Sequence, residues 1–108
     1  MNIFEELKSQ ESKVLIIAEE IQMNKDRPSL AIACNGYKDK LQLISFMLLE
    51  IKEEIDSQYR IDKPKEILEL RSFILNLYEL SNDLYRGINQ EDDNLVRRYS
   101  KEILEVLN

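Results

Sequence analysis

Five glutamates near the middle of the chain are the residues best suited to chemistry. They form two pairs with three-residue spacing and one adjacent acid, namely Glu50, Glu53, Glu54, Glu66 and Glu69. Residues three apart share a helix face, so each pair presents two carboxylates side by side. Carboxylate oxygens are ligands that Mg²⁺ prefers. On adjacent antiparallel helices, the two pairs would form a magnesium site made of Glu50, Glu53, Glu66 and Glu69.

This pattern is similar to that of the all-α nucleotide pyrophosphohydrolases of the MazG and dimeric dUTPase kind, whose helices carry ExxE and then ExxD. The resemblance covers about twenty residues and implies magnesium-dependent hydrolysis of a nucleoside triphosphate. The chain departs from the pattern at Glu69, where aspartate is usual, and at Ile55-Asp56-Ser57, which replaces a glycine-aspartate-leucine context. The simpler interpretation is a solvated acidic face, because a chain with 21 acidic residues contains such pairs by chance. We therefore expect no catalytic residue and no cofactor or metal, and keep the magnesium enzyme as the alternative.

Two clusters of aromatic and arginine residues are candidates for contact with another protein. The first is Tyr59-Arg60-Ile61 and the second is Tyr85-Arg86-Gly87-Ile88, with Arg97 and Arg98 expected near the second. Tyrosine and arginine often anchor protein interfaces because they are large and keep their hydrogen bonds when buried. The alternative interpretation is that both tyrosines only close the ends of the hydrophobic core.

The acids Glu50, Glu53 and Glu54 have a second possible use as a partner-binding surface. They fall in the last turns of an expected helix, where the negative end of the helix dipole disfavours anions. Local helix stability therefore does not explain them. A basic surface on a partner protein would explain these acids. Compensation of their charge by Lys63 and Lys65 at the start of the next helix would explain them as well.

Composition excludes several kinds of function. The 108 residues include no histidine and a single cysteine, Cys34, so the commonest general base, histidine-ligated metals and an intramolecular disulfide are all absent. The net charge of −6 opposes binding to nucleic acid. The longest apolar-dominated run, Leu41 to Ile51, is too short and too interrupted to span a bilayer. The first residues lack the basic and apolar segments of a signal peptide, so we expect a cytoplasmic protein without membrane insertion.

The candidate site residues are positioned by a long helix, which the sequence predicts from apolar residues spaced three and four positions apart. We call this series the apolar ladder. Its members are Leu30, Cys34, Tyr37, Leu41, Ile44, Leu48, Ile51 and Ile55. The ladder predicts one helix of about 48 Å, at ~1.5 Å per residue. Asn35-Gly36 is a common turn dipeptide, but the ladder passes it without a change of phase, which favours a continuous helix with Gly36 as a close-packing point. The run from Leu41 to Leu49 is apolar nearly all round, so we expect it to be covered on several sides.

The whole chain is expected to form one all-α domain, an antiparallel up-down-up-down four-helix bundle with a long second helix. The expected helices cover residues 2–24, 28–59, 63–86 and 90–107. Asn2 is expected to cap the first helix, Pro28 to lie in the first turn of the second, and Asp62 with Pro64 to mark the start of the third. Gly87 is expected to end the third helix in a left-handed conformation, and Asn89 to cap the fourth. The second connection should lie at the same end of the bundle as both termini.

These features favour a small non-enzymatic protein that binds another protein, and its acidic surface would suit a partner with a basic surface. Bacteriocin immunity proteins and phage-encoded inhibitors are often helical proteins of this size, which supports an inhibitor, immunity or adaptor role by analogy of fold alone. The overhang of the long second helix suggests a homodimer as a further possibility. The remaining alternatives are the magnesium enzyme and a self-associating structural subunit.

Overall fold

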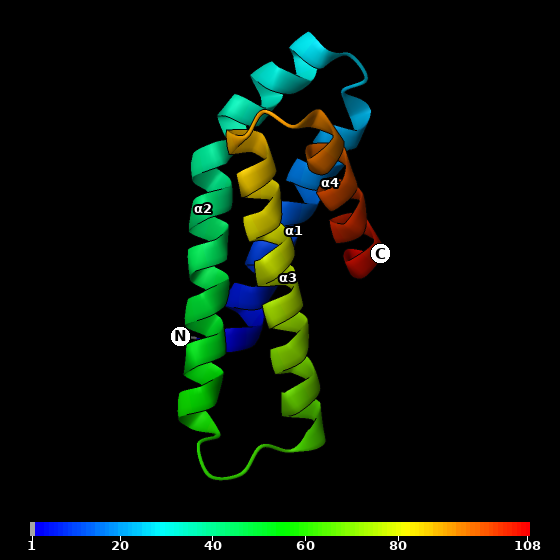
Figure 1. Cartoon of the computed structure of the whole chain (residues 1–108). Coiled ribbons are helices and arrows are strands. Elements are labelled where there is room, and N and C mark those ends of the chain that lie inside the picture. The colour runs from blue at the N-terminus through cyan, green and yellow to red at the C-terminus, as the bar shows by residue number, and fades with distance from the viewer. Residues whose placement is uncertain (1) are drawn as a thin grey trace.

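The computed structural model describes residues 2–108, which form four α-helices. The helices are α1 (Ile3–Met23), α2 (Arg27–Gln58), α3 (Lys65–Asn89) and α4 (Asp93–Leu107). Each helix packs against the next one along the chain, and α4 also packs against α1 (Figure 1). The predicted all-α antiparallel bundle with a long second helix is therefore confirmed.

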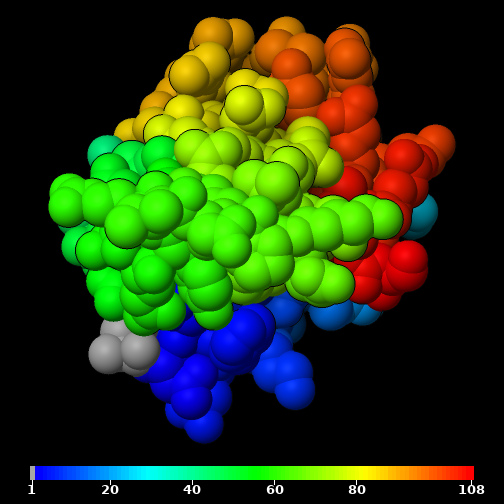
Figure 2. Space-filling model, turned by 90° about the horizontal axis from the view of Figure 1, so that it is seen from below, coloured from blue at the N-terminus to red at the C-terminus, as the bar shows by residue number. Residues whose placement is uncertain are grey.

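The bundle is elongated because α2 and α3 are longer than the other two helices. Its principal extents are 50 × 22 × 21 Å. In Figure 1, the two termini lie part of the way along the α2–α3 hairpin, and the connection between α2 and α3 projects beyond both of them. The expectation that the termini reach the same end as this connection is wrong, since α1 and α4 stop short of it. Seen from that end, the green hairpin lies in front of the rest of the molecule (Figure 2).

The apolar ladder of α2 is the central strip of the core. Seven of its eight members are buried, namely Leu30, Cys34, Leu41, Ile44, Leu48, Ile51 and Ile55, while Tyr37 packs against them partly buried. The helix continues through Asn35 and Gly36, as predicted. Figure 1 shows that α2 bends between its cyan first turns and its green remainder. The ladder remains buried on both sides of that bend.

Two predictions about the surroundings of α2 are wrong. Gly36 is not a close-packing point, because an added Cβ would have nothing within 4 Å of it. The segment from Leu41 to Leu49 is not covered on several sides either, since Leu43 is 59% exposed and Phe46 is exposed to a similar extent. The reason is the ring arrangement, in which α2 packs mainly against α1 and α3 and keeps its outer face open.

The turn from α3 to α4 is built differently from the sequence prediction. Gly87 does not end α3, which continues to Asn89, and the residue with a left-handed backbone is Glu91, at φ 54°. The amide of Asp92 donates to the carbonyl of Gly87 at 3.1 Å, and the amide of Glu91 donates to that of Ile88 at 3.1 Å. These two bonds form a Schellman motif, which satisfies carbonyl groups at the end of α3. Gly87 is instead a close approach between helices, where an added Cβ would lie 3.4 Å from the Cβ of Leu95 and from the amide of Val96.

Helix starts follow the sequence more closely. The side chain of Asn2 accepts hydrogen bonds from the amides of Phe4 and Glu5, so the predicted cap of α1 is confirmed. Pro28 lies in the first turn of α2 as predicted, behind a cap from Asp26. For α4 the cap is Asp92 rather than Asn89, because the Schellman turn occupies the residues between them. Helix α3 starts behind Pro64 without a side-chain cap, and the amides of Ile67 and Leu68 donate to the carbonyl of Pro64.

Four polar side chains are buried in the core: Gln10, Ser45, Ser81 and Ser100. The hydroxyl of Ser100 accepts a bond from Gln22 at 2.6 Å and donates to the carbonyl of Arg97 at 3.0 Å. In residues 2–108, the hydroxyls of Ser45 and Ser81 have no hydrogen-bond partner. A buried hydroxyl without a partner costs free energy, so these two serines weaken the α2 and α3 helices that carry them.

Replacing Gly36 by alanine is expected to raise the free energy of unfolding by about 1 kcal/mol, because alanine favours the helix and meets no neighbour. Gly87→Ala is the matched control, with the same gain in helix propensity but new contacts at 3.4 Å to Leu95 and Val96. Its gain should therefore be smaller. Urea denaturation followed by circular dichroism measures both changes. A loss of stability in Gly36→Ala would show that this position is packed after all.

Replacing Ser81 by alanine is expected to leave the free energy of unfolding unchanged or raise it by up to about 1 kcal/mol, since no hydrogen bond is lost. Ser100→Ala should instead lower it by about 1 kcal/mol, because Gln22 and the Arg97 carbonyl lose a partner. The two variants delete the same oxygen from equally buried sites. Equal destabilisation in both would mean that Ser81 makes a bond in solution.

Candidate functional site

The α2–α3 hairpin carries most of the predicted site residues, and an ion cluster connects its two helices. Asp56 of α2 accepts from Nε of Arg71 in α3 at 2.8 Å and from Nη2 at 3.4 Å. Its carboxylate also lies 3.0 Å from Nζ of Lys52 and 3.8 Å from Nζ of Lys63. One carboxylate is thus shared by three cations, all half-buried. Hydrogen bonds from Arg71 and Lys52 lower the pKa of Asp56 to about 2.

This cluster was only partly predictable from the sequence. Lys63 does compensate the acidic end of α2, as expected, but Lys65 pairs with Glu69 inside α3 at 3.9 Å. Arg71, which makes the shortest contact, was missed. A usable signal existed, because Asp56 lies in the last turn of α2 and Arg71 in the second turn of α3, and antiparallel helices bring such residues together beside their connection.

The connection itself forms the exposed tip of the hairpin, residues 59–64. Tyr59 is half-buried against the core, as the simpler interpretation of this tyrosine predicts. Arg60 is exposed, and the side chain of Ile61 is 99% exposed, more than any other large hydrophobic residue described. The hairpin tip therefore combines an anchored aromatic ring, a free guanidinium and an uncovered aliphatic side chain.

The structure does not bring the four glutamates of the magnesium alternative together. Glu53, Glu66 and Glu69 are exposed, and Glu50 is half-buried. Within the described part of the chain, no three histidine, cysteine, aspartate or glutamate side chains are grouped so that they could hold a metal ion. The arrangement fits a solvated acidic face on α2, to which Glu54 also belongs by its spacing.

The second aromatic cluster lies at the opposite end, beside the connection between α3 and α4. Tyr85 is half-buried against the core, and Arg86 is exposed with its guanidinium 3.7 Å from Asp83. Arg98 lies with its guanidinium carbon 5.6 Å from the ring centre of Tyr99 and bonds to Glu102 at 3.4 Å. These residues remain accessible, but their charges are partly occupied by neighbours on their own helix.

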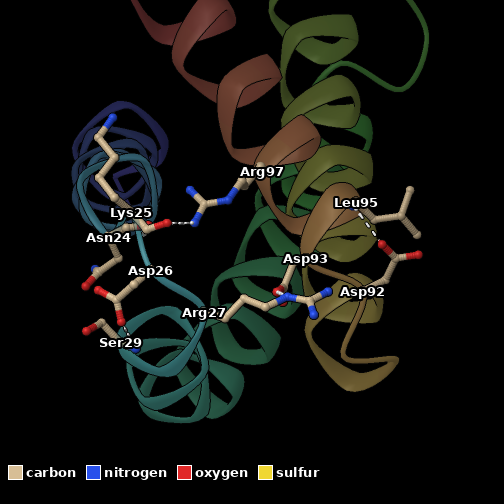
Figure 3. A network of polar contacts seen from close by, with 9 residues as sticks. All are labelled: Asn24, Lys25, Asp26, Arg27, Ser29, Asp92, Asp93, Leu95 and Arg97. Carbon is tan, nitrogen blue, oxygen red and sulfur yellow. Dashed lines mark hydrogen bonds and ion pairs between the residues drawn. The ribbon is translucent and has the colours of Figure 1, made fainter.

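Arg97 serves an internal role that the sequence did not indicate. Its Nη2 donates to the carbonyls of Asn24 at 2.7 Å and Lys25 at 3.1 Å, where α1 ends (Figure 3). Nearby, Nε of Arg27 lies 2.8 Å from Oδ2 of Asp93. Carbonyls at a helix C-terminus lack intrahelical partners, so Arg97 satisfies groups that would otherwise need water. These contacts tie the α1–α2 connection to the start of α4.

Cys34 has the surroundings of a core residue. It is buried, and burial is the main cause that raises the pKa of its thiol, with the carboxylate of Asp93 adding to the effect. A raised pKa keeps the thiol protonated and lowers its reactivity. The predicted assignment of Cys34 to the core is confirmed.

No helix among residues 2–108 is long and apolar enough to cross a membrane. Comparisons with protein-family models, curated proteins and solved structures find no match to this chain.

The ion cluster predicts a specific dependence of stability on pH. The folded state lowers the pKa of Asp56 from 3.8 to about 2, so its carboxylate stabilises the fold above about pH 4. This contribution should be lost as the pH falls from about 4 to about 2. Asp56→Asn should lower the free energy of unfolding at pH 7 by up to about 1 kcal/mol, the usual range for accessible ion pairs.

Thermal unfolding of the wild type and Asp56→Asn between pH 2 and pH 7 measures this contribution, which is the difference between the two curves. Glu69→Gln is the matched control, because its pair with Lys65 is exposed and 3.9 Å long. A difference between wild type and Asp56→Asn that persists unchanged to pH 2 would contradict the assignment.

Proposed function

We propose that this chain acts by binding another protein through the hairpin tip, as an inhibitor, immunity protein or adaptor does. The observation that carries the proposal is the side chain of Ile61, which is 99% exposed at the end of a projecting hairpin. A fully exposed isoleucine gains nothing for the fold, while burial against a partner would remove its apolar surface from water. Arg60 beside it supplies a donor group of the kind enriched at interfaces.

Rigidity of the hairpin supports this use. The Asp56 cluster joins α2 to α3 just behind the tip, and Tyr59 is anchored on the core. Binding by a preorganised surface costs less conformational entropy than binding by a loop that must first become ordered. The tip is therefore suited to insertion into a concave site on its partner.

The acidic face of α2 indicates that the proposed partner carries positive charge where it contacts this chain. Glu50, Glu53 and Glu54 lie in the turns of α2 that precede the tip, and the spacing of Glu50 and Glu53 places them on one face. Lys52, Lys63 and Arg71 are already engaged by Asp56, so these three cations do not offset the acidic face. A partner with a basic rim around a hydrophobic pocket complements both features, and attraction of this kind speeds encounter at low salt.

The test begins with tagged protein recovered from its native host and analysed for chains that copurify. Ile61→Asp should weaken binding of the same partner at least tenfold, because a charge would then enter the proposed hydrophobic pocket. The matched control is Ile32→Asp, which changes a side chain 75% exposed on α2 but near the opposite end of that helix. Both variants should keep the wild-type circular dichroism spectrum.

Affinity for the copurified partner should also fall as salt rises, and more so in the wild type than in a variant with Glu50, Glu53 and Glu54 changed to glutamine. Equal binding by wild type and Ile61→Asp would exclude the hairpin tip as the contact. If no other chain copurifies and the protein sediments as a dimer or larger assembly, the self-associating alternative is favoured.

A further inference from the structure

A hydrophobic groove lies between α1 and α2, far from the hairpin tip. Its volume is about 370 Å³, within the range of pockets that hold small organic molecules. Ile17 and Ile44 of the core form its floor, and Ile16 and Leu43 form its edges at 54% and 59% exposure. Aliphatic side chains this accessible in a concave site leave an apolar surface that a ligand can cover.

Two lysines give the groove a charge opposite to that of the chain as a whole. Lys13 of α1 and Lys40 of α2 both line it, and neither forms an ion pair with any of residues 2–108. Four other lysines, Lys8, Lys25, Lys38 and Lys101, also form no ion pair with residues 2–108, so Lys13 and Lys40 differ from them in lining the same apolar groove. Glu20 is the one acid in the lining.

The antiparallel course of α1 and α2 orders these groups along the groove. Glu20 and Tyr37 are nearest the α1–α2 connection, and Gln10 and Lys13 are at the other end. Within the lining, an anionic group is therefore favoured nearer Lys13 than Glu20; Glu6 is bonded to Gln10 near the Lys13 end but does not line the groove. An elongated anion has one favoured direction in the groove.

Gln10 adds a buried hydrogen-bond donor at the Lys13 end. It is only 2% exposed, and its Nε2 donates to Oε1 of Glu6 at 3.1 Å. A primary amide carries two N–H groups, and the second has no acceptor among the described residues. Gln10 is almost completely buried and yet lines the groove, which favours contact with a small molecule over contact with the flat surface of a protein or a membrane.

We propose that this groove binds a free amphipathic carboxylate with an unbranched aliphatic tail of medium length. The carboxylate accepts hydrogen bonds from Gln10 and Lys13, and the tail lies over Ile16 and Leu43 toward Tyr37. Lys40 also lines the groove and adds a second positive charge to it. This inference does not rest on the proposed function, because it uses none of the residues of the hairpin tip.

The test uses decanoate, titrated into the full chain with amide chemical shifts recorded by NMR. Saturable shifts at millimolar or lower concentration should be confined to α1 and α2 around the groove. Leu43→Glu should weaken binding at least tenfold, and so should Ile16→Glu, a second exposed position that keeps the test valid if one variant misfolds. The control Ile32→Glu changes a side chain that is 75% exposed and lies outside the groove, so this variant should bind as the wild type does.

Decan-1-ol separates the role of the head group from that of the tail. Lys13→Gln should weaken decanoate binding several-fold and leave decan-1-ol binding unchanged, because only the acid has a charge for Lys13 to meet. The proposal is overturned if decanoate shows no saturable binding, if Ile32→Glu loses as much affinity as Leu43→Glu, or if Lys13→Gln affects acid and alcohol equally. It is also overturned if the chain binds phosphatidylcholine–phosphatidylglycerol vesicles but not the free acid, or if sedimentation shows the groove closed by a second copy.

Discussion

Burial of the apolar stripe of α2 is the interaction on which the rest of the structure depends. The stripe runs from Leu30 to Ile55 and contacts neighbouring helices along nearly the whole length of the bundle. Each aliphatic side chain removed from water contributes about 1.5–3 kcal/mol before the entropy of ordering is subtracted. No polar interaction in the molecule acts over a comparable length. Helices α1 and α3 are arranged as they are because they must cover this stripe, and α4 packs against both of them.

Helix α2 has only two main neighbours, and this explains which parts of its surface are buried and which are exposed to solvent. Since α2 packs mainly against α1 and α3, its outer face keeps Leu43 and Phe46 in solvent, and the α1–α2 groove opens beside them. Since α1 and α4 are shorter, the α2–α3 hairpin extends past them and must be held by its own contacts, chiefly the Asp56 cluster. Both surfaces proposed to bind ligands thus follow from differences in helix length and from the ring arrangement.

The two ends of the bundle are closed by different means. At the end with two connections, Arg97 and the Arg27–Asp93 pair join the α1–α2 connection to α4, and the Schellman turn at Glu91 lets α4 start close to α3. The approach of α4 to α3 is possible because Gly87 has no side chain. At the hairpin end a single ion cluster suffices, because only two helices meet there. The hairpin end is therefore held by fewer contacts between helices than the end with two connections.

The sequence by itself determined the helices, their order and the buried face of α2, because helical periodicity, the cap at Asn2 and the first-turn Pro28 depend on residues a few positions apart. It also placed Cys34 in the core and carried α2 through Asn35-Gly36. Only the tertiary structure decided which glycine is closely packed, which face of α2 stays open, and which partners Asp56 and Arg97 have. These depend on the contact between helices distant in the chain, and on their lengths relative to one another, neither of which leaves a periodic signal. For the same reason the glutamate pairs suggested a metal site on paper, while the fold keeps their carboxylates from forming one cluster.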